Sequence, residues 1–130
     1  MFLEHVNMTV SDLDRSIDFY SRLLGLSVRW RRDAGDDLPA AAHVGDERCY
    51  LAMFQAAGDT APAKQDYEGV GLNHFGFVVD DLDGVRARLI DLGITPHFEP
   101  EYDPGRRLYF LDPDGIEVEI VEYGAAAVGG

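Results

Sequence analysis

The sequence contains an internal repeat at an offset of 69 residues, and any fold must accommodate it. Residues 4–14 align with residues 73–83, and apolar residues alternate with polar ones in the first part of both segments. Five of the eleven aligned pairs are identical: His5/His74, Val10/Val79, Asp12/Asp81, Leu13/Leu82 and Asp14/Asp83. The repeat therefore predicts one strand, one turn and one helix start that occur twice in the chain.

A helix with recognisable ends follows each repeated strand. Asp12 and Asp81 are suitable N-caps, and Gly25 and Gly93 suit the left-handed residue that closes a helix. Apolar residues recur between these ends at spacings of three and four, which is typical of a helix with one buried face. The predicted buried positions are Leu13, Ile17, Tyr20 and Leu24 in the first helix and Leu82, Val85, Leu89 and Leu92 in the second.

Three extended segments follow each helix. They are 26–32, 42–44 and 49–55 in the first half and 95–99, 108–111 and 117–123 in the second. Each half is thus a βαβββ module, and the chain is predicted to be an α+β protein of two tandem modules with curved mixed sheets around a cavity. We expect one domain over 1–123, with module one at 1–55, a linker at 56–68, module two at 69–123 and a flexible tail at 124–130.

Composition limits the partners of this chain. Its 130 residues are 46% hydrophobic and carry a formal net charge of −13, which suits a globular domain and repels nucleic acid and anionic lipid surfaces. No apolar stretch is long enough to span a membrane, and a single cysteine excludes an intrachain disulfide. We therefore expect a cytoplasmic protein that binds a small molecule, with no nucleic-acid or membrane partner.

Alternation along the strands places three potential ligands on one side of their sheets. In the first strand Val6, Met8 and Val10 should lie under the helix, which leaves His5 on the opposite face. By the same parity His74 faces away from the second helix, and Glu119 takes the matching side of the last strand. His43 and His97 could approach a cavity from loops, but we expect them on the surface.

Two histidines and a glutamate supply nitrogen and oxygen donors for one divalent metal ion and leave coordination positions free for water or substrate. The set suits Fe²⁺, which we favour, or Mn²⁺, Zn²⁺ or Ni²⁺. The alternative is that the histidines are ordinary strand residues and that Glu117 and Glu119 form the solvated face of an edge strand. Matched register in two repeats favours the metal site, because a core role gives no reason for histidine to recur.

The sequence resembles the vicinal oxygen chelate superfamily, which includes glyoxalase I, extradiol dioxygenases, fosfomycin-resistance thiol transferases and bleomycin-resistance proteins. The resemblance runs from residue 3 to residue 123. It is carried by EHV at 4–6, VSDLDRSIDFY at 10–20, LLGL at 23–26, NHFGFVVDD at 73–81 and YFLDPDG at 109–115 followed by EVE at 117–119. It implies a metal bound by His5, His74 and Glu119, and a homodimer in which one site can take ligands from two chains.

The resemblance also implies a choice among reactions. Glyoxalase I has a fourth, carboxylate ligand, but the matching position here is Ala52, so we predict an extradiol dioxygenase-like enzyme with Tyr109 as the active-site tyrosine. The alternatives are a glyoxalase-like isomerase or lyase and a thiol transferase, for which Arg106 and Arg107 would be the candidate cations. An alternative of another class is a drug-binding protein without catalysis, with Trp30, Phe54 and Tyr109 around an aromatic crevice.

Overall fold

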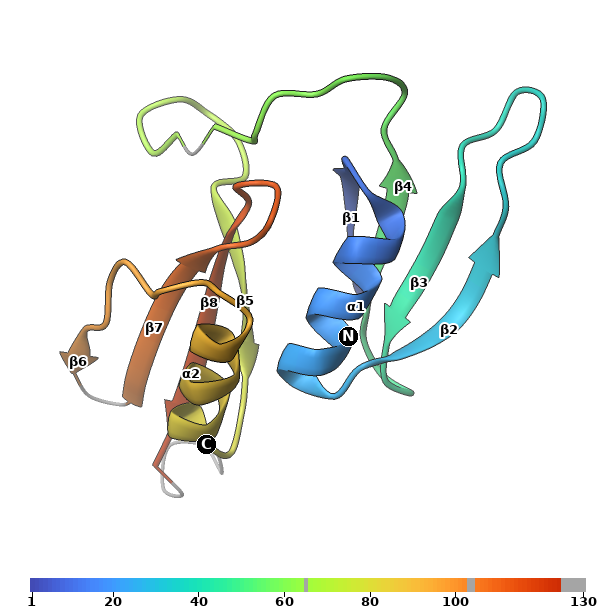
Figure 1. Ribbon diagram of the computed structural model, residues 1–130. Coiled ribbons are helices and arrows are strands. Elements are labelled where there is room, and N and C mark those ends of the chain that lie inside the picture. The colour runs from blue at the N-terminus through green and yellow to red at the C-terminus, as the bar shows by residue number, and fades with distance from the viewer. Residues whose placement is uncertain (65, 103–104, 125–130) are drawn as a thin grey trace. The chain divides into compact units, whose positions relative to one another are not determined.

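The computed structural model describes residues 1–64, 66–102 and 105–124, with the side chains of 101 and 102 excepted (Figure 1). The predicted tail beyond residue 124 lies outside the described residues. The chain divides into two compact units, Met1–Ala61 and Pro62–Gly130. Both units have the order strand, helix, three strands. The predicted α+β architecture of two βαβββ modules is confirmed.

In the first unit, strand β1 is adjacent to the last strand of the module rather than to the next one. The elements are β1 (His5–Val10), α1 (Leu13–Leu24), β2 (Ser27–Arg32), β3 (Ala41–Gly45) and β4 (Tyr50–Gln55). The sheet order is β1-β4-β3-β2, with β1 parallel to β4 and the other pairs antiparallel. Met8 and Val10 are buried whereas His5 is exposed, so the predicted parity of β1 is confirmed.

The second unit repeats this topology. Its elements are β5 (His74–Val78), α2 (Leu82–Asp91), β6 (Glu101–Tyr102), β7 (Gly105–Leu111) and β8 (Glu117–Tyr123). The sheet order is β5-β8-β7-β6, again with one parallel pair, β5 with β8 (Figure 1). Val118 and Ile120 are fully buried, while Glu119 between them points to the other face. Both sheets are therefore mixed, as predicted.

The ends of both helices match the sequence signals. The Asp12 carboxylate accepts a hydrogen bond from the backbone N–H of Arg15 at 3.1 Å, and Asp81 accepts one from Gly84 at 3.0 Å. Gly25 follows α1 with a φ of 69°. The buried stripe of α1 differs in detail from the prediction. Leu13 and Tyr20 are buried as predicted, but Ile17 and Leu24 are only half-buried, and Ser16, Phe19 and Leu23 complete the buried face.

The predicted strand at 95–99 is wrong. Only Phe98 forms a bridge, to Tyr109, and the regular strand β6 begins two residues after the predicted one ends. Pro96 lies within the segment and Pro100 directly follows it, and neither has an N–H to donate to a regular ladder. The segment still lies alongside β7, because the backbone N–H of His97 donates to the carbonyl of Tyr109 at 2.9 Å.

The turn before β8 is stabilised by a buried carboxylate. Asp112 is 4% exposed, and its Oδ1 accepts the backbone N–H groups of Asp114 at 2.9 Å and Ile116 at 3.0 Å. Gly115 has a φ of 83°, which a residue with a side chain rarely adopts. The turn sets the point at which β8 begins, and so fixes Glu117 and Glu119 in their register with β5.

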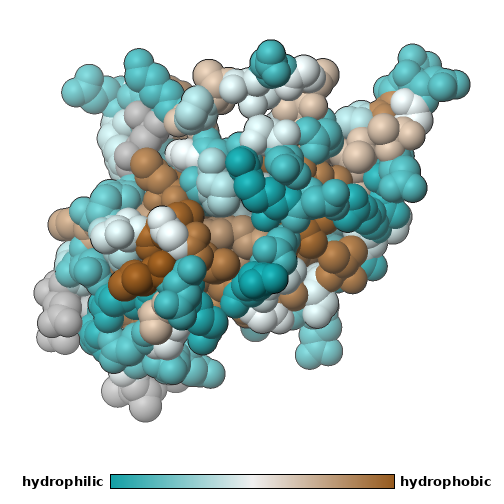
Figure 2. Space-filling model, in the orientation of Figure 1, coloured by the Kyte–Doolittle hydropathy of each residue, from teal (hydrophilic) through white to brown (hydrophobic). Residues whose placement is uncertain are grey.

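Hydrophilic side chains cover most of the face shown in Figure 2, with hydrophobic residues in smaller patches between them. This agrees with the acidic composition of the chain. Among the described residues, none of the helices has the length and apolarity needed to cross a membrane.

Candidate functional site

His74 and Glu119 lie together on one face of the second sheet. Because β5 and β8 are adjacent and parallel, Nε2 of His74 comes within 3.1 Å of Oε1 of Glu119. The other ring nitrogen, Nδ1, is 2.7 Å from Oδ1 of Asn73. Each ring nitrogen thus faces an oxygen acceptor, and the tautomer that donates from Nδ1 to Asn73 is the one that would leave the Nε2 lone pair for a metal ion.

The separation of Nε2 of His74 and Oε1 of Glu119 is that of a hydrogen bond and is also compatible with two ligands of one metal ion. Donor atoms about 2.1 Å from one ion and at right angles to each other are about 3 Å apart, close to the separation of these two atoms. The contact between Nδ1 of His74 and the Asn73 amide oxygen restrains the imidazole, and metal-binding histidines commonly have such a hydrogen bond on the ring nitrogen that does not bind the ion. Within the described ranges, however, no three His, Cys, Asp or Glu side chains form a cluster that could hold an ion.

The second oxygen of Glu119 has a cationic partner. Nε of Arg107, on β7, donates to Oε2 of Glu119 at 3.0 Å, and both side chains are mostly buried, at 11% and 16% exposed. The guanidinium also lies over the ring of Tyr123. Arg107 is therefore a strand residue that orients Glu119, rather than one of a pair of loop cations for a substrate.

A cavity of about 460 Å³ opens beside His74. Tyr109 lies at its wall, with its ring 5.4 Å from that of His74 in an edge-to-face arrangement and 5.6 Å from that of Phe98. The predicted active-site tyrosine is thus adjacent to the predicted ligand. The lining residues are Tyr67, His74, His97, Phe98, Tyr109 and Glu117.

Glu117 and His97 were not predicted as site residues, and both contribute to this cavity. The Glu117 side chain is only 2% exposed, so the alternative of a solvated edge-strand face does not hold for this residue. Its Oε2 is 2.8 Å from Nε2 of His97, and its Oε1 accepts the hydroxyl of Tyr67. The His97 side chain is 40% exposed, in line with the predicted surface position, but it also contacts the buried Glu117 carboxylate. Strand parity was the available signal, since Glu117 shares a face with Glu119.

His5 lies on the first unit in an aromatic stack. Its ring is 4.9 Å from that of Tyr50, which in turn stacks on His43 at 4.4 Å. Nδ1 of His5 is 3.0 Å from Oε1 of Glu4, and this hydrogen bond is the main cause that lowers the pKa of the Glu4 carboxyl. The imidazole is 45% exposed and so remains accessible on the face away from α1.

The register of the first sheet supports the assignment of Ala52 to the position at which a fourth, carboxylate ligand was considered. Ala52 of β4 pairs with Asn7 of β1, as Glu119 of β8 pairs with Gly76 of β5. Ala52 therefore occupies the place in the first module that Glu119 occupies in the second. An alanine has no donor atom, and the first module offers no carboxylate at this position.

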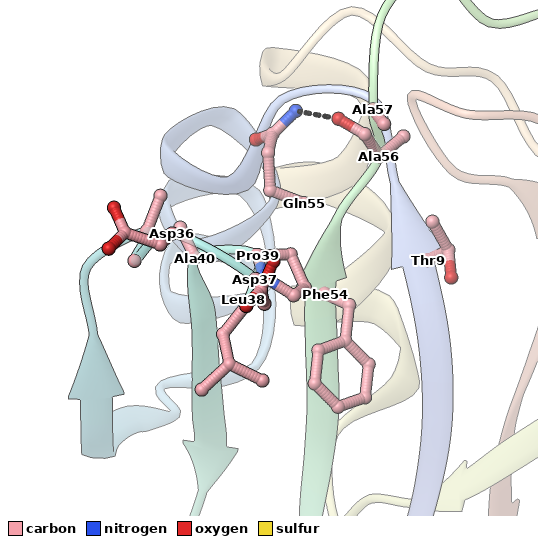
Figure 3. A pocket seen from close by; sticks show the side chains of 12 residues that line it. Thr9, Asp36, Asp37, Leu38, Pro39, Ala40, Phe54, Gln55, Ala56 and Ala57 are labelled. Carbon is pink, nitrogen blue, oxygen red and sulfur yellow. Dashed lines mark hydrogen bonds between the residues drawn. The ribbon is translucent and has the colours of Figure 1, made fainter.

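The first unit has a second cavity, of about 790 Å³, where the 34–40 loop meets the end of β4 (Figure 3). Figure 3 shows the side chains of Leu38 and Phe54 extending to the same side, while the Gln55 amide donates to the carbonyl of Ala56. No histidine or cysteine lines this cavity. Its described lining thus lacks the imidazole groups of the cavity beside His74, although Asp36 and Asp37 supply carboxylates.

Comparison with known proteins agrees with the fold. The family model of the Glyoxalase/Bleomycin resistance protein/Dioxygenase superfamily matches residues 2–120. The chain belongs to this superfamily. A structure of a glyoxylase/bleomycin resistance protein/dioxygenase domain from Frankia sp. EAN1pec is 26% identical, with a TM-score of 0.80 over 95% of this chain and 98% of that one.

Two curated relatives of this superfamily member carry different activities in their names. Glutathione transferase FosA of Serratia marcescens is 32% identical over 91% of this chain and 78% of its own length. Catechol-2,3-dioxygenase of Bacillus subtilis is 28% identical over 89% of this chain, which spans 39% of that protein. Membership therefore leaves the reaction to be inferred from the site.

Proposed function

We propose that this protein is a metal-dependent enzyme of extradiol dioxygenase type, with His5, His74 and Glu119 as its ligands. The observation that supports the proposal most is the convergence of Nε2 of His74 and Oε1 of Glu119, 3.1 Å apart, beside a cavity. His5 is the proposed third ligand because it occupies the register position of His74 in the first module. It would be supplied by the same chain or by a second copy.

A bound ion, with Fe²⁺ favoured, would supply Lewis acidity and open positions for two adjacent oxygens of the substrate. The chain itself prepares the two donors of the second unit. Asn73 orients the ring of His74, and Arg107 engages one oxygen of Glu119 so that the other faces the histidine. The absence of a carboxylate at Ala52 leaves the set at three ligands.

The cavity favours a planar aromatic substrate over an anionic one. Three of the six lining residues are aromatic: Tyr67, Phe98 and Tyr109. None of the described lining residues is Lys or Arg, whereas a phosphonate would need cationic partners. An aromatic ring can stack against such walls while its two hydroxyls face His74 and Glu119.

Thiol transfer is the second candidate, and the 32% identity to glutathione transferase FosA favours it. A glyoxalase-like reaction and metal-free drug binding remain alternative outcomes of the experiment below. The homodimer and the cytoplasmic location also remain predictions.

The test begins with elemental analysis of protein purified without added metal or chelator. We expect about one divalent ion per site in the wild type and its loss in His5→Ala, His74→Ala and Glu119→Ala. Oxygen uptake is then measured with a panel of catechols, and consumption of glutathione with fosfomycin. Metal-dependent oxygen uptake supports the first candidate, and glutathione consumption supports the second. A metal-free wild type that binds a cationic drug would contradict the enzymatic proposal.

A further inference from the structure

Strand β2 forms one edge of the first sheet (Figure 1) and contains a β-bulge at Arg29. Its register with β3 shifts by one residue between Val28 and Trp30, so two residues of β2 oppose one residue of β3. Neighbouring side chains of a regular strand point to opposite faces, and a bulge interrupts this alternation. The bulge therefore allows Arg29 and Trp30 to point to the same face of the sheet.

Both side chains lie on the face that is directed away from α1. Tyr50 of β4 pairs with His5 of β1 and stacks on its ring, which places Tyr50 on this face. The guanidinium carbon of Arg29 is 4.6 Å from the centre of the Tyr50 ring. The ring of Trp30 is 4.8 Å from that of His43, which stacks on Tyr50 in turn. A cation and an indole therefore share one aromatic surface.

Arg31 shows where a regular strand would have placed Arg29. Nη2 of Arg31 is 2.6 Å from Oδ1 of Asp14, so this side chain extends toward α1. Alternate residues of a regular strand share a face, and Arg29 would then lie on the α1 side as well. Bulges commonly re-aim a side chain next to a binding site. The bulge thus gives Arg29 a position that an arginine needed only for solubility would not require.

Arg29 keeps its hydrogen-bond donors available for a ligand. A guanidinium has five N–H donors, and its contact with an aromatic ring uses none of them as a hydrogen bond. Among the residues that the structure describes, the contact partner of Arg29 is the Tyr50 ring rather than a carboxylate. The nearby Glu4 carboxylate accepts the Tyr50 hydroxyl at 3.3 Å. Burial is the main cause that lowers the pKa of His43, and the charge of Arg29 is the next, so this charge acts across the aromatic surface.

Arg32 is a second cation on this surface, and it has an acceptor within the protein. Its guanidinium carbon lies 5.6 Å from the centre of the Trp30 ring. Its Nε and Nη2 groups donate to the carbonyl of Pro39 at 3.3 and 2.9 Å. Arg32 therefore adds to the positive potential beside Trp30, while Arg29 is the arginine whose donors are available.

We propose that Arg29 and Trp30 form a binding site for an aromatic carboxylate on the first unit. A guanidinium binds a carboxylate through two parallel hydrogen bonds, and the exposed part of the Trp30 indole, 43% of the residue, offers a surface for a planar ring. One available arginine in a chain with a net charge of −13 suits a single negative charge better than a phosphate dianion. The inference goes beyond the proposed function, because it needs no metal ion and includes none of the proposed ligands.

Trp30 is the only tryptophan of the chain, so its fluorescence reports on this site. The probe is benzoate. Benzamide has the same ring without the charge, and acetate has the carboxylate without the ring, so these two compounds are the ligand controls. Each compound is titrated at low ionic strength into the protein as purified. The titrations are repeated with EDTA, which removes any metal ion that could hold the carboxylate elsewhere.

The variants are Arg29→Gln and Arg29→Lys, with Arg31→Gln as the matched control. Both glutamine variants remove one positive charge from β2, but Arg31 extends toward α1. We expect benzoate to bind the wild type saturably with and without EDTA, and its Kd to rise about 10- to 100-fold in Arg29→Gln through loss of the charged hydrogen bonds. The Kd should rise less in Arg29→Lys, which keeps the charge but not the planar pair of donors. It should change by less than about 2-fold in Arg31→Gln.

Several results would overturn the inference. It is wrong if benzoate causes no saturable change in wild-type emission, or if benzamide or acetate binds as tightly as benzoate. It is also wrong if Arg29→Gln and Arg31→Gln weaken binding equally, because the effect would then come from net charge. Loss of binding with EDTA would show that a metal ion holds the carboxylate, which contradicts this site but not the proposed enzyme. Circular dichroism checks the fold of each variant, and Arg29→Lys decides the comparison if Arg29→Gln does not fold.

Discussion

Replacing Asp112 by alanine should weaken the second module, because this side chain shapes the turn that precedes β8. Its Oδ1 accepts two backbone N–H groups, from Asp114 at 2.9 Å and from Ile116 at 3.0 Å. Both bonds are part-buried, and Asp112 itself is 4% exposed. Alanine offers no acceptor, so two backbone donors would lose their partner at once.

The magnitude follows from the cost of an unpaired donor. Each part-buried N–H that loses its acceptor costs about 1–3 kcal/mol, and water entering the turn recovers some of it, so we expect a loss of about 2–4 kcal/mol. Asp112→Asn keeps an acceptor oxygen and should lose only about 1 kcal/mol, the difference between a charged and a neutral acceptor.

The assay is urea unfolding followed by far-ultraviolet circular dichroism. With a urea dependence of about 2 kcal/mol/M, the midpoint should fall by about 1–2 M in Asp112→Ala. Asp46→Ala is the matched control, because Oδ1 of Asp46 accepts two backbone N–H groups in the same way, at 2.8 and 2.9 Å, but at an exposed turn. Water can replace that carboxylate, so its loss should cost clearly less.

Equal losses in Asp112→Ala and Asp46→Ala would refute this reasoning, because they would show that burial of the turn adds nothing. Metal content provides a second readout. Since the turn sets the register of Glu119, Asp112→Ala should also weaken metal binding, whereas Asp46→Ala should leave it unchanged.

Three further changes should give smaller or more local effects. Tyr67→Phe removes the hydroxyl that donates to buried Glu117, and should lower the free energy of unfolding by about 1–2 kcal/mol in urea titrations. Gly45→Ala places a Cβ 2.5 Å from a backbone carbon of the neighbouring strand, and should lower the melting temperature through a loss of about 1–3 kcal/mol. Hydrogen bonds lower the pKa of the Asp83 carboxyl; the largest effect comes from Arg106 and the next from Arg86 of α2. The stabilisation from its charge is therefore present above its unfolded pKa and is lost as pH falls through the folded value, so the difference in stability between wild type and Asp83→Asn should shrink below about pH 4.

Local signals made the architecture predictable. Asp12 and Gly25 mark the ends of α1 in the sequence because an N-cap carboxylate and a left-handed glycine act on the adjacent backbone alone. Alternation likewise placed Val10 in the core and His5 on the opposite face, since the parity of a strand needs no knowledge of its neighbours. Because the second module repeats the first, the predictions of helix ends and of strand parity could be extended to it.

The residues that sequence reasoning missed depend on contacts between distant segments. Glu117 is buried by Tyr67, from a segment predicted as a linker, and by His97, from a segment wrongly predicted as a strand. Pro96 within that segment and Pro100 after it keep it out of the regular ladder, so its side chains follow no simple alternation. No local pattern indicates such a contact, and only the folded module brings these groups together.

The parallel pairing of β5 with β8 has a consequence for how the module folds. A helix and two strands separate β5 from β8 in the sequence, so the two proposed ligands His74 and Glu119 meet only through a long-range contact. Closing such a loop carries an entropic cost before any contact repays it, and topologies of this kind fold slowly. We therefore expect the two side chains to meet late in folding, so that an ion bound by them would stabilise the completed module. Metal added during refolding should therefore slow unfolding of the finished module more than it accelerates the approach to it.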